Sequence, residues 1–144
     1  MKVSDILRSK GDDVATIDPA APLTEAAHVL AIRKIGALVV STDGSDVVGI
    51  ISERDIVTRF AERGATGLDS PIHGAMTSDV YTCTPSDSVD SLMRVMTDRR
   101  IRHLPVIDEG RLAGLVSIGD VVKRRIDELE SVTDQLTDYI QTGR

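Results

Sequence analysis

The chain has 144 residues, of which 41% are hydrophobic but only 2% are aromatic, so its core must be built from Val, Ile, Leu, Ala and Met. Its 23 acidic and 17 basic side chains give a formal charge of −6, which disfavours binding to the phosphate backbone of nucleic acids. The length allows one domain or two small ones.

The amino-terminal segment carries charges at Lys2, Asp5, Arg8 and Lys10, so it lacks the unbroken apolar region of a secretory signal. The sequence contains no run of about 18 apolar residues, the length that a membrane helix requires. Its single cysteine, Cys83, excludes an intramolecular disulfide, and no His/Cys cluster has the spacing of a zinc site. We therefore expect a cytoplasmic protein with no membrane segment and no metal.

The two halves of the sequence resemble one another. Residues 16–19 (Thr-Ile-Asp-Pro) align with 82–85 (Thr-Cys-Thr-Pro) at an offset of 66, and the apolar pattern that follows matches as well. After a polar turn the offset becomes 65, so that 49–57 align with 114–122. A hairpin loop tolerates a change of one residue easily. We therefore call the two halves the first copy and the second copy.

Both copies predict the same order of elements. A short extended segment is followed by a helix with apolar residues at intervals of three and four. Two runs rich in β-branched residues around turn residues then predict a hairpin. A second helix begins at Ser52 in the first copy and at Ser117 in the second. The segments before these helices are 16–19, 23–30, 37–40 and 47–51 in the first copy, and 82–85, 89–96, 103–107 and 112–116 in the second.

The connector at 59–75 contains several Gly residues and a Pro, and a lead-in at 3–7 is echoed at 72–76. These features predict an α/β (α+β) fold of two β-α-β-β-α repeats packed about a pseudo-twofold axis. The expected divisions are a first domain at 1–70, a second domain at 71–125 and a long C-terminal amphipathic helix at 126–144.

The segments 49–55 (Gly-Ile-Ile-Ser-Glu-Arg-Asp) and 114–120 (Gly-Leu-Val-Ser-Ile-Gly-Asp) resemble the Gly-x-x-Ser/Thr-x-x-Asp signature of CBS domains. Residues 103–108 are similar to the strand that precedes this signature in the family. The resemblance covers roughly residues 1–124 and is that of a stand-alone CBS domain pair, or Bateman module. It implies a non-catalytic module that binds an adenine nucleotide in the cleft between its repeats.

Each signature places a Ser and an Asp at the start of a helix, where free N–H groups and the helix dipole favour a polar ligand. A carboxylate there can accept hydrogen bonds from both hydroxyls of a ribose. The same Ser-x-x-Asp pattern is also how a helix caps itself, so both interpretations stay open. The predicted ribose-binding residues are Ser52, Asp55, Ser117 and Asp120.

The resemblance further implies that adenine lies between apolar residues and is recognised by backbone groups of the first extended segment. Plain core packing is the alternative role for most of these positions. The predicted adenine-binding residues are Val14, Ala15, Thr16, Ile35 and Ala37 in the first copy, and Val80, Tyr81, Thr82, Ile101 and Pro105 in the second.

Phosphate groups need cations, and the densest basic cluster contains Arg100, Arg102 and His103. Arg54 lies inside the first signature, whereas Gly119 replaces it in the second, so the two sites should differ. These four residues, Arg54 included, are the predicted phosphate-binding residues. A solvated charged face is the alternative interpretation.

We expect no catalytic cofactor. The regulatory ligand is an adenine nucleotide, with AMP first and ATP, ADP, NAD or S-adenosylmethionine as alternatives. The family resemblance implies a homodimer through the CBS helices, and a sensor also needs a client protein. The alternative function is a dimeric scaffold with a vestigial, ligand-free cleft.

An enzyme would need Cys83 as nucleophile with His28, His73 or His103 as base, but Cys83 occupies an apolar strand position matched by Ile17.

The C-terminal helix has apolar residues at intervals of three and four, and it is longer than a CBS unit needs. It could pack on its own domain, on a second subunit or on a client. Its many acidic residues argue against a membrane surface.

Overall fold

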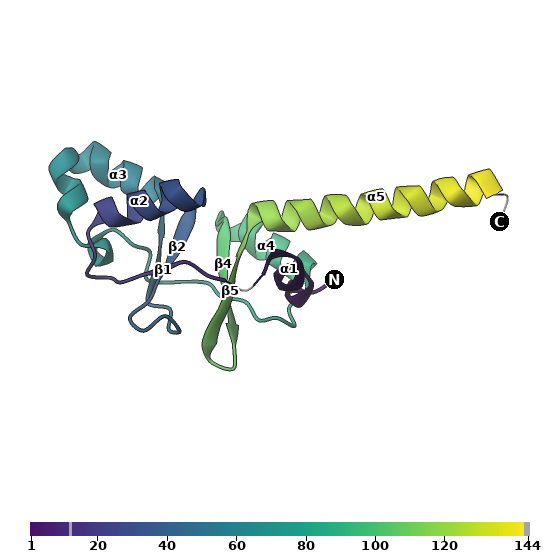
Figure 1. The fold of residues 1–144 in the computed structure, drawn as a ribbon, viewed down its shortest axis with the longest axis horizontal. Helices are drawn as coiled ribbons and strands as arrows, with labels where there is room; N and C mark the ends of the chain where they lie inside the picture. The colour runs from purple at the N-terminus through teal and green to yellow at the C-terminus, as the bar shows by residue number, and fades with distance from the viewer. Residues whose placement is uncertain (12, 143–144) are drawn as a thin grey trace.

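The computed structural model describes residues 1–11 and 13–142, so residues 143 and 144 of the expected C-terminal helix lie outside the described residues. Figure 1 shows two lobes side by side and one long helix that leaves the second lobe. The helices and strands are, in chain order, α1 (Val3–Lys10), β1 (Thr16–Ile17), α2 (Leu23–Arg33), β2 (Ala37–Val40), β3 (Gly49–Ser52), α3 (Glu53–Arg63), the 3-10 turns η1 (Ala65–Asp69) and η2 (Ile72–Gly74), α4 (Val89–Arg99), β4 (His103–Asp108), β5 (Arg111–Ser117) and α5 (Ile118–Thr142).

The first lobe is built on a three-stranded sheet. Strand β2 lies between β1, to which it is parallel, and β3, to which it is antiparallel. Thr16 is opposite Val39, and Ala37 is opposite Ser52. The core beneath helix α2 is aliphatic, as the near absence of aromatic residues predicted. Its fully buried side chains include Leu23, Leu38, Ile51 and Ile72.

The second lobe repeats this plan with a smaller sheet. Strands β4 and β5 form an antiparallel hairpin in which His103 is opposite Ser117. The place of β1 is taken by a single parallel bridge between Cys83 and Val106. The predicted order of strand, helix, strand, strand, helix is confirmed in both copies, although the first strand of the second copy is reduced to this bridge.

The ends of the helices are fixed by local chemistry. The Ser52 hydroxyl accepts a hydrogen bond from the Asp55 N–H, and the Asp55 carboxylate accepts one from the Ser52 N–H, which forms a capping box at α3. Helices α2 and α4 end at Lys34 and Arg100, each in the left-handed conformation with φ of 55°. The left-handed residue turns the chain from each helix into the following strand.

The two copies exchange their lead-in segments. Helix α1 packs on the second lobe, where Val3 and Ile6 join the buried cluster around Val89 (Figure 1). Conversely, Ile72 of the second lead-in is fully buried in the core of the first lobe. The hydrophobic cores therefore cross the expected division between residues 70 and 71, and the pseudo-twofold relation includes the lead-in segments.

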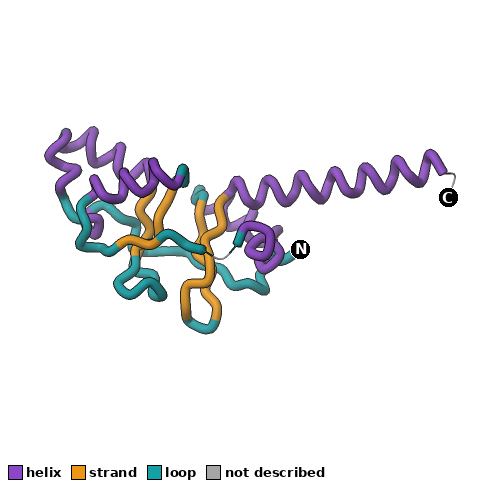
Figure 2. Tube along the Cα trace, viewed as in Figure 1, coloured by secondary structure: helices purple, strands orange, loops and turns teal. Residues whose placement is uncertain are grey.

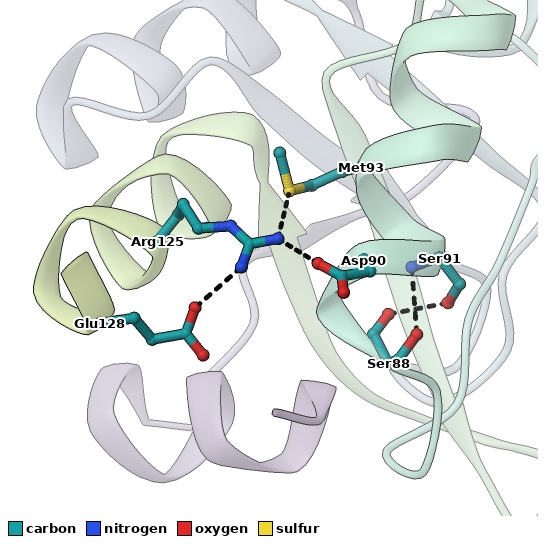
Figure 3. Close-up of polar contacts among 6 residues, drawn as sticks. All are labelled: Ser88, Asp90, Ser91, Met93, Arg125 and Glu128. Atoms are coloured by element: carbon teal, nitrogen blue, oxygen red, sulfur yellow. Dashed lines mark hydrogen bonds and ion pairs between the residues drawn. The ribbon is translucent and has the colours of Figure 1, made fainter. Parts of the chain in front are cut away.

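Helix α5 is attached to the second lobe only along its first turns. Val121 is buried, and Arg125 forms ion pairs with Asp90 of α4 and with Glu128, as Figure 3 shows. From Leu129 onward every described residue is exposed, and the helix extends away from both lobes (Figure 2). Among the described helices, none is both long enough and apolar enough to cross a membrane.

Two equivalent glycines allow a direct test of this packing. A Cβ atom at Gly49 would lie 2.5 Å from Sδ of Met76 and 2.9 Å from the backbone oxygen of Thr77. At Gly114 the nearest atom, at 2.5 Å, is the flexible end of Leu7. We expect Gly49→Ala to lower the free energy of unfolding by about 1–3 kcal/mol, and Gly114→Ala to lower it less, because a side-chain end can move aside. Urea unfolding measures both, and an equal or larger loss for Gly114→Ala would contradict this packing.

Candidate functional site

A cavity of about 580 Å³ lies between the two lobes. Its wall is made of the chain between α1 and β1, the end of α2 with the start of β2, and side chains from β4, β5 and the start of α5. The lobes meet closely beside it, since a Cβ atom at Gly36 would lie 3.4 Å from Cε1 of His103. The described lining residues are Lys10, Gly11, Asp13, Val14, Ala15, Arg33, Lys34, Ile35, Gly36, Ala37, His103, Leu115, Ser117 and Asp120.

This cavity brings together predicted site residues from both copies. The residues predicted to bind adenine in the first copy and the pair predicted to bind ribose in the second copy line the same cavity, so this cavity is shared between the lobes. The cavity-lining residues that the sequence had selected are Val14, Ala15, Ile35, Ala37, His103, Ser117 and Asp120.

The other predicted site residues do not line this cavity. Tyr81 lies beneath the guanidinium of Arg99, with 4.9 Å between the guanidinium carbon and the ring centre. Because Ala15 stands at the matching position of the first copy, the two halves present different surfaces here. Thr16 follows the lining residue Ala15 but does not line the cavity itself, and it stays a prediction. The remaining predicted residues stay predictions for the pseudo-symmetric position: Ser52, Arg54, Asp55, Val80, Tyr81, Thr82, Arg100, Ile101, Arg102 and Pro105.

Asp120 is the best-connected acidic group of the cavity. Its carboxylate accepts a hydrogen bond from the Ser117 N–H at 2.9 Å, and its own N–H donates to the Ser117 hydroxyl at 3.2 Å. Lys10 Nζ donates to the same carboxylate at 2.6 Å and to the Leu115 carbonyl at 2.7 Å. Burial raises the pKa of Asp120, but the hydrogen bonds from Lys10 and Ser117 outweigh it and hold the pKa below the ordinary value of an aspartate. Asp120 is therefore a carboxylate at neutral pH.

Asp55 has a different environment at the equivalent position. It accepts hydrogen bonds from the N–H and the hydroxyl of Ser52, both at 2.9 Å. Within residues 1–11 and 13–142, no ion pair reaches Asp55. The cation at Asp120 therefore distinguishes the two signature sites.

The cations around the cavity come mainly from the first lobe. Lys10, Arg33 and Lys34 line it, and Arg33 forms an ion pair of 3.8 Å with Asp13. Burial and the nearby Lys10 lower the pKa of His103, so its imidazole is neutral at pH 7 and offers a hydrogen bond rather than a charge. Lys10, Arg33 and Lys34 are not among the site residues predicted from the sequence, although Arg33 and Lys34 form a basic pair separated by two residues from the predicted strand at 37–40.

Cys83 lies outside the cavity, in the core of the second lobe. The thiol is buried, 3.7 Å from the Pro105 carbonyl, and burial raises its pKa to about 12. A protonated, buried thiol is a poor nucleophile because the thiolate is the reactive form. Among the described residues, no group of three His, Cys, Asp or Glu side chains is arranged to hold a metal ion.

Solved structures of other proteins have the same fold. A CBS-domain containing protein from Agrobacterium tumefaciens, ATU1752, is 46% identical with a TM-score of 0.84, over 87% of this chain and 99% of that chain. CBS domain protein PAE2072 from Pyrobaculum aerophilum, complexed with AMP, is 29% identical with a TM-score of 0.79, over 92% and 99%.

A third structure is the CBS domain pair of protein MJ0100 in complex with 5′-methylthioadenosine and S-adenosyl-L-methionine. It is 26% identical with a TM-score of 0.79, over 89% of this chain and 98% of that chain. The family model of the CBS domain matches this sequence twice, at residues 3–62 and 72–127. The two matches cover most of the sequence and coincide with the two copies, so the chain belongs to the CBS domain family and contains a pair of CBS domains.

Proposed function

We propose that this protein is a non-catalytic regulatory module that binds an adenosine-containing ligand in the cavity between its lobes. The observation that carries the proposal is the position of Ser117 and Asp120, which face the segments at 14–15 and 35–37 across one cavity. AMP is the first candidate, and ADP, ATP, NAD and S-adenosylmethionine are the alternatives.

The size and chemistry of the cavity support this ligand class. Its volume of about 580 Å³ is within the range of small-molecule sites, roughly 300–1,000 Å³. Ionised Asp120 at the start of α5 can accept hydrogen bonds from ribose hydroxyls, while Ile35 and Ala37 provide apolar surface for a base. The complexes of PAE2072 with AMP and of MJ0100 with S-adenosyl-L-methionine and 5′-methylthioadenosine support the same class.

A ligand in this position would act on the relation between the lobes. It would contact both copies, and a ligand that binds one arrangement of them more tightly shifts the population towards that arrangement. The change would reach an unidentified client protein through the outer helices. A buried, protonated Cys83 fits a regulatory rather than a catalytic role, and a single free thiol fits a reducing cytoplasm.

The outer helices also favour a homodimer. Ile32 of α2 and Val57 and Phe60 of α3 are 67%, 65% and 53% exposed. Val122 of α5, at the position equivalent to Val57, is 47% exposed. Apolar side chains at equivalent places on both lobes form a surface that a second copy of the pair can cover.

A scaffold without a ligand is the second candidate function. The observation that favours it is the exposed apolar row along the free part of α5, which no described residue covers. This row consists of Leu129, Val132, Leu136, Tyr139 and Ile140, each at least 58% exposed. In this reading the α5 surface binds the partner and the cavity stays empty.

Ligand binding is tested by thermal unfolding of protein freed of bound small molecules. AMP at about 100 times its dissociation constant stabilises a folded protein by roughly 2.7 kcal/mol, which is several degrees for a chain of this size. We expect Asp120→Asn to lose most of this shift, because it removes the charged acceptor for ribose, and Asp55→Asn to retain it. An undiminished shift in Asp120→Asn would disprove the ribose assignment. No shift of the parent protein with any adenosine compound would favour the scaffold.

The dimer is tested by sedimentation equilibrium of Val57→Asp and Phe60→Asp. Each change places a charge in the apolar surface of the outer helices, so we expect the parent to be a dimer and both variants to be monomers. Leu136→Asp is the matched control on the free part of α5 and should stay dimeric. If it alone gives monomers, the copies associate through α5 instead.

A further inference from the structure

Lys10 marks the clearest difference between the signature site at Asp120, which lines the cavity, and the equivalent site at Asp55. We infer that Lys10 makes this cavity selective for ligands with a 5′-phosphate: its ammonium neutralises Asp120 when the cavity is empty and bonds the phosphate when ribose takes Asp120. This inference rests on the proposed function and deepens it, since it names phosphorylated adenosines as the preferred class.

Lys10 is part of the wall of the cavity and bonds two other residues beside it. Its side chain lines the cavity, and Nζ donates to Asp120 at 2.6 Å and to the Leu115 carbonyl at 2.7 Å. Lys10 is the last residue of α1, which packs on the second lobe through Val3 and Ile6. The ammonium is thus attached to a fixed helix, while its flexible side chain can redirect it.

In the first lobe, the position equivalent to Leu115 is bonded by backbone groups and not by a cation. Ile50, which is equivalent to Leu115, exchanges two backbone hydrogen bonds of 2.9 Å with Thr77. At Leu115 the Lys10 ammonium supplies the donor instead, and it reaches Asp120 at the same time. Lys10 is therefore an addition to the repeat at one site only.

Selectivity follows from competition for one carboxylate. The Lys10 ammonium and the Ser117 N–H both bond Oδ2 of Asp120. A ribose whose two hydroxyls bond both carboxylate oxygens therefore competes with Lys10 for Oδ2. A neutral adenosine displaces the ammonium and gives it no new partner. A 5′-phosphate gives it a strong one, because hydrogen bonds between an ammonium and a phosphate are charge-assisted.

The other charges of the cavity leave this role open to Lys10. Arg33 already pairs with Asp13, and His103 is neutral at pH 7. Lys34 lines the cavity from the first lobe, and among the described residues no ion pair joins it to Asp120. Lys10 is the cavity-lining cation that bonds Asp120, the predicted ribose acceptor. A ligand whose ribose binds Asp120 therefore brings its 5′-phosphate close to the Lys10 ammonium.

Calorimetric titration with AMP and with adenosine tests the inference, because these two compounds differ only by the phosphate. In Lys10→Gln we expect AMP to bind about tenfold more weakly, which is the low end of what a charge-assisted hydrogen bond contributes, and adenosine to bind at least as tightly as in the parent. The matched control is Lys2→Gln, an exposed lysine at the other end of α1 that does not line the cavity, and it should leave both affinities unchanged.

A second measurement needs no ligand. Carbon NMR of the Asp120 carboxyl should report a higher pKa in Lys10→Gln than in the parent, because the hydrogen bond from Lys10 contributes to the lowered value. An unchanged Asp120 pKa would overturn the contact on which the inference rests.

The titrations also separate the two possible failures. If Lys10→Gln weakens AMP and adenosine by the same factor, Lys10 has only a structural role and the inference is wrong, while the proposed function stands. If neither compound binds the parent protein, the proposed function fails and the selectivity of Lys10 fails with it.

Discussion

The exchange of lead-in segments between the two copies is the constraint on which the rest of the structure depends. Val3 and Ile6 complete the core of the second lobe, and Ile72 completes that of the first. Neither copy can bury its apolar residues fully without a segment that precedes the other copy. The lobes therefore fold as an interlocked pair, and the cavity lies at their shared boundary.

This interlocking also makes the cavity asymmetric. Helix α1 delivers Lys10 to Asp120 on the second lobe, whereas the equivalent connection of the first lobe is a backbone bridge between Ile50 and Thr77. Two signature helices that look alike in sequence thus have different electrostatic surroundings. A duplicated fold can in this way hold one site whose carboxylate is paired with a cation and, among the described residues, one whose carboxylate is not.

The repeat order and the helix starts could be predicted from the sequence because they depend on local chemistry. The Ser-x-x-Asp pairs form capping contacts at both helix starts, as their spacing predicted. The residues that lie opposite each Ser-x-x-Asp pair could not be predicted, because they depend on packing between the two copies. Asp120, for example, lines one cavity with Val14 and Ile35 of the other lobe. The sequence alone shows Lys10 only as a charge near the amino terminus, because nothing local links it to a residue 110 positions away.

The capping interpretation and the ribose interpretation of the signature are compatible in this geometry. Asp120 uses its backbone N–H and one carboxylate oxygen for the helix start, and its side chain still lines the cavity. The cap fixes the orientation of the carboxylate before any ligand arrives, which lowers the entropic cost of binding. Stability of the helix and recognition in the cavity are therefore served by the same side chain.

Backbone amide NMR during a titration with AMP tests the central claim most directly, because it reports which residues surround the ligand. The account predicts that signals of Ala15, Ile35 and Asp120 move together with one saturation curve, since they line one cavity from both lobes. Changes confined to one lobe, or to the exposed part of α5, would contradict a ligand site shared between the two copies.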